Sequence, residues 1–124
     1  MLEMMTSSIL KKITEPGTAF DPEVFQKLLA DDGAPYDNFG DSVATSADGS
    51  TVVIGASRDD DKGDGSGSAY IFTKQSNGSY LETQKLVPVD GAARDRFGFS
   101  VAASDTSVVA GAFNHLSKGT AYVY

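Results

Sequence analysis

Short runs of β-branched and aromatic residues alternate along the chain with stretches rich in Gly, Asp and Ser. Such runs, bounded by turn residues, predict β-strands joined by tight turns. The pattern predicts seven strands, at Phe39–Thr45, Thr51–Ala56, Ser68–Thr73, Tyr80–Val87, Phe97–Ala103, Ser107–Ala112 and Thr120–Tyr124. We therefore expect an all-β protein.

An earlier segment allows two interpretations. Residues 20–33, FDPEVFQKLLADDG, suit a helix when read alone, because Asp21 can cap its start and Pro22 fits its first turn. The similar stretch at residues 79–91, SYLETQKLVPVDG, has Pro88 where a helix would have to continue. Two copies of one unit should share one fold, so we predict strands in both.

The similarity between these stretches belongs to an internal repeat. Residues 23–46 align on residues 81–104 without gaps, with 13 identities in 24 positions. TVVIGA then returns as SVVAGA, and GSAYIF returns as GTAYVY, while the offset shrinks from 58 to 56 and 52. Both changes of offset fall in loops, where changes of length are tolerated. A four-stranded unit of about 50–58 residues is typical of one β-propeller blade.

The repeated residues resemble FG-GAP repeats, the blades of the integrin α-subunit propeller and of many microbial and algal surface proteins. Phe39-Gly40 and Phe97-Gly98 match the FG, and Gly55-Ala56 and Gly111-Ala112 match the GA, although neither copy has the proline. The resemblance covers residues 23–124. It implies about two four-stranded antiparallel blades of an incomplete β-propeller. It also implies a non-catalytic recognition or adhesion role, outside the cell or at its surface, with a protein or glycan ligand.

The expected units span about residues 23–80 and 81–124, after an N-terminal lead of residues 1–22. The lead is expected to be disordered or to hold part of a preceding strand, at Ile9–Thr14 or Gly17–Phe20. A propeller cannot close on two blades, so further blades must come from a longer chain or from other copies. The second possibility gives an alternative function, a small homo-oligomeric lectin-like propeller assembled from two-blade chains.

Charge and motifs narrow the classes of function. Seventeen acidic residues against ten basic ones give a net charge of −7, which disfavours nucleic acid as a partner. No apolar run is long enough for a membrane span, so we do not expect a transmembrane protein. His115 is the sole histidine, and we interpret it as an exposed loop residue. Without a nucleophile elbow or a His/Cys metal motif, we expect no enzyme.

One acidic loop is a candidate calcium site, with Asp59, Asp60, Asp61 and Asp64 inside SRDDDKGDGSGS. Ca²⁺ takes six to eight oxygen ligands, and a Gly-rich loop can fold around it. Some integrin-type blades carry a D-x-D-x-D-G-x-x-D calcium loop, but here Lys62 stands at one ligand position. The alternative is a solvated hairpin.

Four other acids recur in the repeat, and we predict that they shape turns by accepting backbone N–H groups: Asp32, Asp37, Asp90 and Asp95. The Phe of each FG pair should fill the gap between blades. Of the five tyrosines, we expect Tyr70, Tyr122 and Tyr124 to pack within strands.

Overall fold

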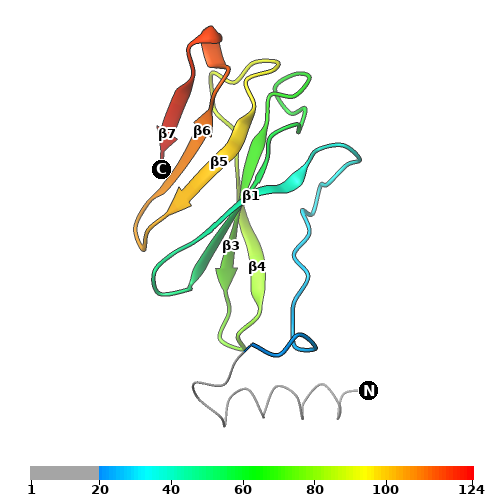
Figure 1. The fold of residues 1–124 in the computed structure, drawn as a ribbon, viewed down its shortest axis with the longest axis vertical. Helices are drawn as coiled ribbons and strands as arrows, with labels where there is room; N and C mark the ends of the chain where they lie inside the picture. Colours follow the sequence, from blue (N-terminus) through cyan, green and yellow to red (C-terminus); the bar gives the residue numbers. More distant parts are fainter. Residues whose placement is uncertain (1–19) are drawn as a thin grey trace.

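The computed structural model describes residues 20–124, which form two antiparallel sheets (Figure 1). The first sheet has the order β1-β2-β3-β4, with β1 at Phe39–Thr45, β2 at Thr51–Ala56, β3 at Ser68–Lys74 and β4 at Tyr80–Leu86. The second has the order β5-β6-β7, with β5 at Phe97–Ala103, β6 at Val108–Ala112 and β7 at Thr120–Val123. A short 3-10 turn, His115–Ser117, precedes β7. The prediction of an all-β protein with about two antiparallel blades of an incomplete propeller is confirmed, with three of the four strands present in the second sheet.

The strand predicted within residues 20–33 is wrong, although the rejected helix is absent there too. Residues 25–30 have no regular secondary structure, because the backbone of this leading segment forms no ladder with any described strand. Its contact with β4 uses a side chain instead: Gln26 Nε2 donates to the Tyr80 carbonyl at 2.8 Å, and Tyr80 N donates to Gln26 Oε1 at 2.7 Å. The possible preceding strands lie outside the described residues, apart from Phe20.

Each FG pair forms a β-bulge at the start of a blade. The register shifts between Phe39 and Ser42 in the first sheet, and between Phe97 and Ser100 in the second. The bulge glycines Gly40 and Gly98 have φ values of +94° and +83°, which side-chain-bearing residues rarely adopt. The repeated glycine is therefore required by the backbone of the bulge.

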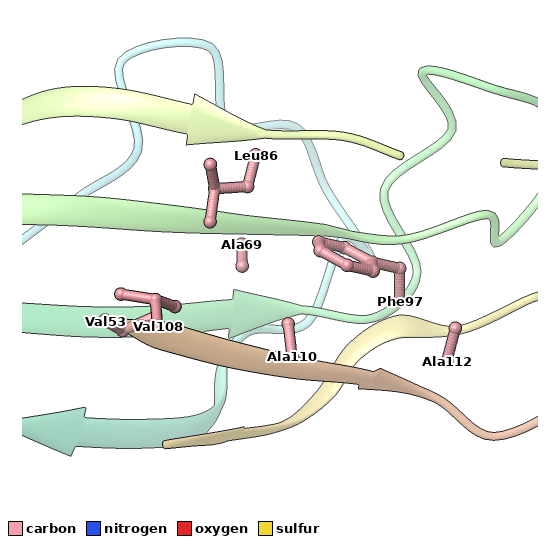
Figure 2. Packing of buried hydrophobic residues seen from close by; sticks show 7 residues of the cluster. All are labelled: Val53, Ala69, Leu86, Phe97, Val108, Ala110 and Ala112. Carbon is pink, nitrogen blue, oxygen red and sulfur yellow. The ribbon is translucent and has the colours of Figure 1, made fainter. Parts of the chain in front are cut away.

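Two apolar clusters lie on opposite faces of the first sheet. The cluster between the two sheets, the inter-blade core, is shown in Figure 2 and consists of Val53, Ala69, Leu86, Phe97, Val108, Ala110 and Ala112. The outer core contains Ile54, Ala56, Tyr70 and Phe72, with Leu28, Ala30 and Phe39 packed against it. Phe97 is fully buried, so the prediction that the FG phenylalanine fills the gap between blades is confirmed at this joint.

The two sheets approach most tightly where β2 meets β5. A Cβ atom added at Gly55 would lie 1.8 Å from the Gly98 carbonyl oxygen. The same oxygen accepts a 2.6 Å hydrogen bond from Ser42 Oγ. The glycine of the GA motif is therefore fixed by the packing of one blade on the next.

Candidate functional site

Four loops make up one end of the blades, which we call the loop face: residues 31–38, 57–67, 90–96 and 113–119. Figure 1 shows the green, yellow and red loops of this face at the same end of the molecule. Backbone hydrogen bonds join them, from Arg58 N to Asp37 O at 3.1 Å, from Arg94 N to Asp64 O at 2.7 Å and from Asn114 N to Asp95 O at 3.3 Å. Their exposed side chains are therefore held on a connected backbone.

The described non-glycine residues with positive φ all lie in the loop face: Tyr36, Asn38, Arg94, Arg96, Leu116 and Ser117. The first four are two repeat-matched pairs, with φ of 72° and 69° at Tyr36 and Arg94. Such conformations cost energy and persist only where the surroundings impose them. Tyr36 is 89% exposed, Leu116 77% and Phe113 57%, so this rigid end presents large apolar side chains to solvent.

The four aspartates of the predicted calcium loop do not all lie together. Asp59 is buried and accepts from Ser68 Oγ at 2.6 Å and Tyr70 Oη at 3.1 Å, and its side chain lies beside that of Asp61. Asp60 Oδ1 instead accepts the Gly65 N–H at 2.7 Å, closing the loop on itself. Asp64 is exposed and contributes its backbone oxygen to the neighbouring loop. Calcium binding by this set of four stays a prediction.

Asp32 completes the acidic cluster, with one oxygen of each of Asp32, Asp59 and Asp61 lying within 4.8 Å of the others. A cation from β4 already occupies its centre, since Lys85 Nζ lies 2.5, 2.7 and 2.8 Å from these three carboxylates in turn. The ammonium also lies 5.2 Å from the centre of the Tyr70 ring. Tyr70 Oη donates to Asp32 Oδ1 at 2.8 Å, so Asp32 binds side chains here and the predicted turn role is wrong.

The protonation of this cluster follows from its contacts. Burial disfavours the charged form of Lys85, but the hydrogen bonds to Asp32, Asp59 and Asp61 outweigh it and raise its pKa. Burial likewise acts to raise the pKa of Asp59, yet the Lys85 and Ser68 hydrogen bonds leave it below the usual value. Burial and the hydrogen bond to Asp32 raise the pKa of Tyr70. The cluster is therefore a lysine held by ionised carboxylates.

The second unit has a related corner, and it corrects the interpretation of His115. The His115 side chain is buried, with Nδ1 2.6 Å from Asp95 Oδ2 and Nε2 3.4 Å from Asp90 Oδ2. The histidine can be buried because carboxylates face both ring nitrogens. Its hydrogen bond to Asp95 raises the pKa of His115. Tyr122 Oη donates to Asp90 Oδ1 at 2.9 Å, and burial with this bond raises the pKa of Tyr122 to about 12.

The turn role predicted for Asp37 and Asp95 is confirmed. Asp37 Oδ2 accepts the Ala34 N–H at 2.9 Å, and Asp95 Oδ2 accepts the Ala92 N–H at 2.8 Å. Asp90, like Asp32, accepts a hydrogen bond from a tyrosine hydroxyl instead, so the predicted turn role is wrong for Asp90 too. Sequence reasoning missed Lys85, although the repetition of Gln26-Lys27-Leu28 as Gln84-Lys85-Leu86 was a usable signal.

The contacts of the acidic cluster and of His115 suit a structural role, in which side chains fix loops to strands. Both nitrogens of His115 face carboxylates, and the lysine of the acidic cluster is surrounded by three of them. Within residues 20–124, no helix has the length and apolar character that a membrane span requires.

The FG-GAP repeat family matches the chain over residues 23–72 and again over residues 80–124. Each matched segment begins at the position of a fourth strand and ends at a third strand, so it runs from one blade into the next. A search of curated proteins gave no match.

Proposed function

The chain belongs to the FG-GAP repeat family, and from this we propose that it is a non-catalytic interaction module that binds a protein or glycan ligand. FG-GAP repeats are generally interaction or adhesion modules and are often extracellular. We propose the same setting for this chain, at the cell surface or outside the cell. We expect the ligand to bind at the ends of the blades, because propellers commonly bind ligands with the loops there.

The observation that carries this proposal is that the loops of the loop face are joined by backbone hydrogen bonds and expose large side chains. Tyr36 and Arg94 occupy matching positions in the repeat, share a positive φ and are exposed. Phe113 packs edge-on against Phe99 with ring centres 4.8 Å apart, and both remain more than half exposed. Aromatic and arginine side chains on a pre-formed backbone are frequent anchors in protein interfaces, and aromatic rings also stack on sugars.

The proposal is tested by binding of the labelled chain to a glycan array and to a panel of immobilised cell-surface proteins. A ligand is then titrated against Tyr36→Ala, Arg94→Ala and Phe113→Ala. Lys74→Ala is the matched control, because Lys74 is exposed at the end of β3 and outside the loop face. We expect about a tenfold or greater loss of affinity in at least one loop-face variant, with the control unchanged. Ligand binding that all three variants leave intact would place the surface elsewhere.

Calcium support is the finer part of the proposal, and it concerns the acidic cluster. Its three carboxylates supply the oxygen chemistry that Ca²⁺ prefers, but Lys85 supplies a competing positive charge. We therefore expect Ca²⁺ to bind there only in competition with the Lys85 ammonium. Calorimetry on the wild type and on Lys85→Met checks this, with Asp59→Asn in each background as the control. Heat that Asp59→Asn abolishes would support a calcium site, and no heat in either protein would end the prediction.

A second candidate function is a lectin-like homo-oligomeric propeller, in which several copies complete one another's blades. The free edge of the three-stranded sheet favours it, because β7 pairs with β6 alone among the described strands. An exposed sheet edge is a template for another strand. Glycan binding that appears only in an oligomeric fraction would favour this candidate over a monomeric module.

A further inference from the structure

The chain contains one complete joint between blades, and the joint has two parts. In the first part, β4 pairs with the edge of β3, with Tyr70 opposite Lys85 and Ile71 opposite Gln84. In the second part, β5 packs across β2, where Gly98 meets Gly55. Residues on the covered face of the first sheet are consequently buried, as at Val53 and Ala69.

The second sheet has residues equivalent to the covered positions of β2 and β3, but no described strand covers them there. Val109, Gly111 and Ala121 correspond in the repeat to Val53, Gly55 and Ala69. Val109 and Gly111 are half-buried and Ala121 is exposed, and together with Ser100 and Ala102 they line a shallow hollow of about 180 Å³. We call this surface, with the adjoining edge of β7, the acceptor face.

The residues of β4 and β5 that form the joint have counterparts ahead of the first sheet and in β1. The leading segment repeats the Gln-Lys-Leu of β4. Leu28 and Phe39 both pack against the outer core, as Leu86 and Phe97 both belong to the inter-blade core. Gly40 repeats the bulge of Gly98, but a Cβ atom built on it would find no heavy atom within 4 Å. Among the described residues, the leading segment and β1 therefore have no blade to pack on in the way that β4 and β5 pack on β3 and β2.

Charges on the two surfaces are complementary. In the first sheet, the acid and tyrosine pair of Asp32 and Tyr70 receives the ammonium of Lys85. The matching pair, Asp90 and Tyr122, has the His115 imidazole nearby but no lysine, and the Asp90 side chain is 63% exposed. Lys27 matches Lys85 in the repeat, is exposed and forms no ion pair with another described residue.

We propose that the acceptor face binds residues 23–45 of a second copy of this chain, with Lys27 of that copy paired to Asp90. The register of β3 and β4 places Lys27 opposite Tyr122 and Gln26 opposite Val123. Gly40 of the second copy then packs on Gly111, and Ser100 Oγ donates to its carbonyl as Ser42 Oγ donates to Gly98. Each copy would enter one neighbour and receive another, so such contacts propagate until a ring closes.

A second copy is favoured over an unrelated strand because both halves of the joint are specified by this sequence, down to the lysine and the bulge glycine. The net charge of −7 on each copy opposes association in general, so a local pairing such as Lys27 with Asp90 must select it. A propeller of about six to eight blades needs about three or four copies. The inference rests on the second candidate function, a propeller completed by several copies, and it is independent of which ligand the loop face binds.

The test is the mass of the full chain by size-exclusion chromatography with light scattering, in about 150 mM salt to screen the net charge. We expect three or four times 13.0 kDa for the wild type. Lys27→Glu and Asp90→Lys should each be monomeric alone. An equimolar mixture should regain a multi-copy mass with an even number of copies, because the two variants must alternate: the intact Lys27 of one meets the intact Asp90 of the other, and the altered pair is charge-reversed. Lys74→Glu, an equal change of charge at an exposed strand end, should behave as the wild type.

A second measurement does not depend on altered charges. The chain has no cysteine, so Gln26→Cys with Val123→Cys tests the register directly, and Gln26→Cys with Thr120→Cys is the out-of-register control. Oxidation should give a ladder of disulfide-linked copies with the first pair and little with the second, since paired strand residues bring Cβ atoms to about 5 Å. A monomeric wild type, or equal cross-linking by both pairs, overturns the proposal. Ligand binding by that same monomer would leave the proposed function standing.

Discussion

β2 and β6 have nearly the same sequence, TVVIGA and SVVAGA, yet only one of them is buried on both faces. Val53 of β2 is fully buried between the sheets, whereas its counterpart Val109 in β6 is only half-buried. The buried positions of β6, Val108, Ala110 and Ala112, all face the first sheet. The comparison shows that burial in a repeat protein is a property of having a neighbour, since an apolar strand acquires it only when the next unit is present.

The largest contrast is expected at the two GA glycines. Gly55→Ala should destabilise the chain by about 3 kcal/mol or more, because its Cβ would overlap the Gly98 carbonyl and the two sheets would have to separate. Gly111→Ala meets only Ser100 Oγ, at 2.6 Å, which can rotate away. Urea unfolding of both variants in the monomeric Lys27→Glu background measures the difference, because in an assembly Gly40 of a second copy would also pack on Gly111. Equal losses would mean that contact between the two sheets is not what requires glycine at position 55.

Leu86 and Leu28 match in the repeat, so truncating each one compares the stability contributed by the joint with that contributed by the leading segment. Leu86→Ala should lower the free energy of unfolding by about 3 kcal/mol, because Leu86 is buried in the inter-blade core. Leu28→Ala should lower it by about 1 kcal/mol, since Leu28 is only half-buried at the outer core. Thermal or urea unfolding in the same monomeric Lys27→Glu background compares them. A Leu28→Ala loss as large as that of Leu86→Ala would show that the leading segment is part of the folded core.

The matched lysines compare an occupied carboxylate pair with a free one. Lys85→Met should cost about 2 kcal/mol, less than for a fully buried pair because Asp32 and Asp61 are half exposed. Lys27→Met should leave the unfolding of the monomer unchanged.

The lysine contrast also has a pH signature. Folding lowers the pKa of Asp32 and Asp59, so their contribution is present above about pH 4 and is lost as the pH falls through the folded-state pKa values. Lys85→Met should therefore flatten the acid side of the stability profile. An acid limb of unchanged slope in that variant would contradict the ion-pair account.

The smallest effect on stability is expected at His115, which lies near Asp90 and Tyr122 in the second unit. Because folding raises the pKa of His115, its contribution is fully present below about pH 6.5 and is lost as the pH rises through the folded-state pKa. His115→Gln should remove this part of the pH dependence. Thermal unfolding from about pH 5 to about pH 9 checks it. Parallel profiles for wild type and variant would show that the imidazole stays neutral.

The strands were predictable because each is a short β-branched or aromatic run between turn residues, and the repeat required one fold for both copies. The leading segment was mispredicted for a physical reason: a strand needs a ladder partner, and sequence similarity to β4 does not supply one. The acidic loop was recognised as a charged site, but Asp60 closes that loop on itself and Asp64 contacts the neighbouring loop through its backbone oxygen. Asp32 and Lys85 are far from that loop in sequence, so no local pattern could place them in the cluster.

The sequence alone determined the all-β class, the bounds of seven strands to within one residue, the family and the equivalence of positions across the repeat, because these depend on local periodicity and on the repeat itself. Only the tertiary structure decided which cation sits among the carboxylates, that His115 is buried, and which of two equivalent faces is covered. Those outcomes depend on contacts between residues distant in the chain. In a two-unit chain, such contacts differ between units even where the residues are the same.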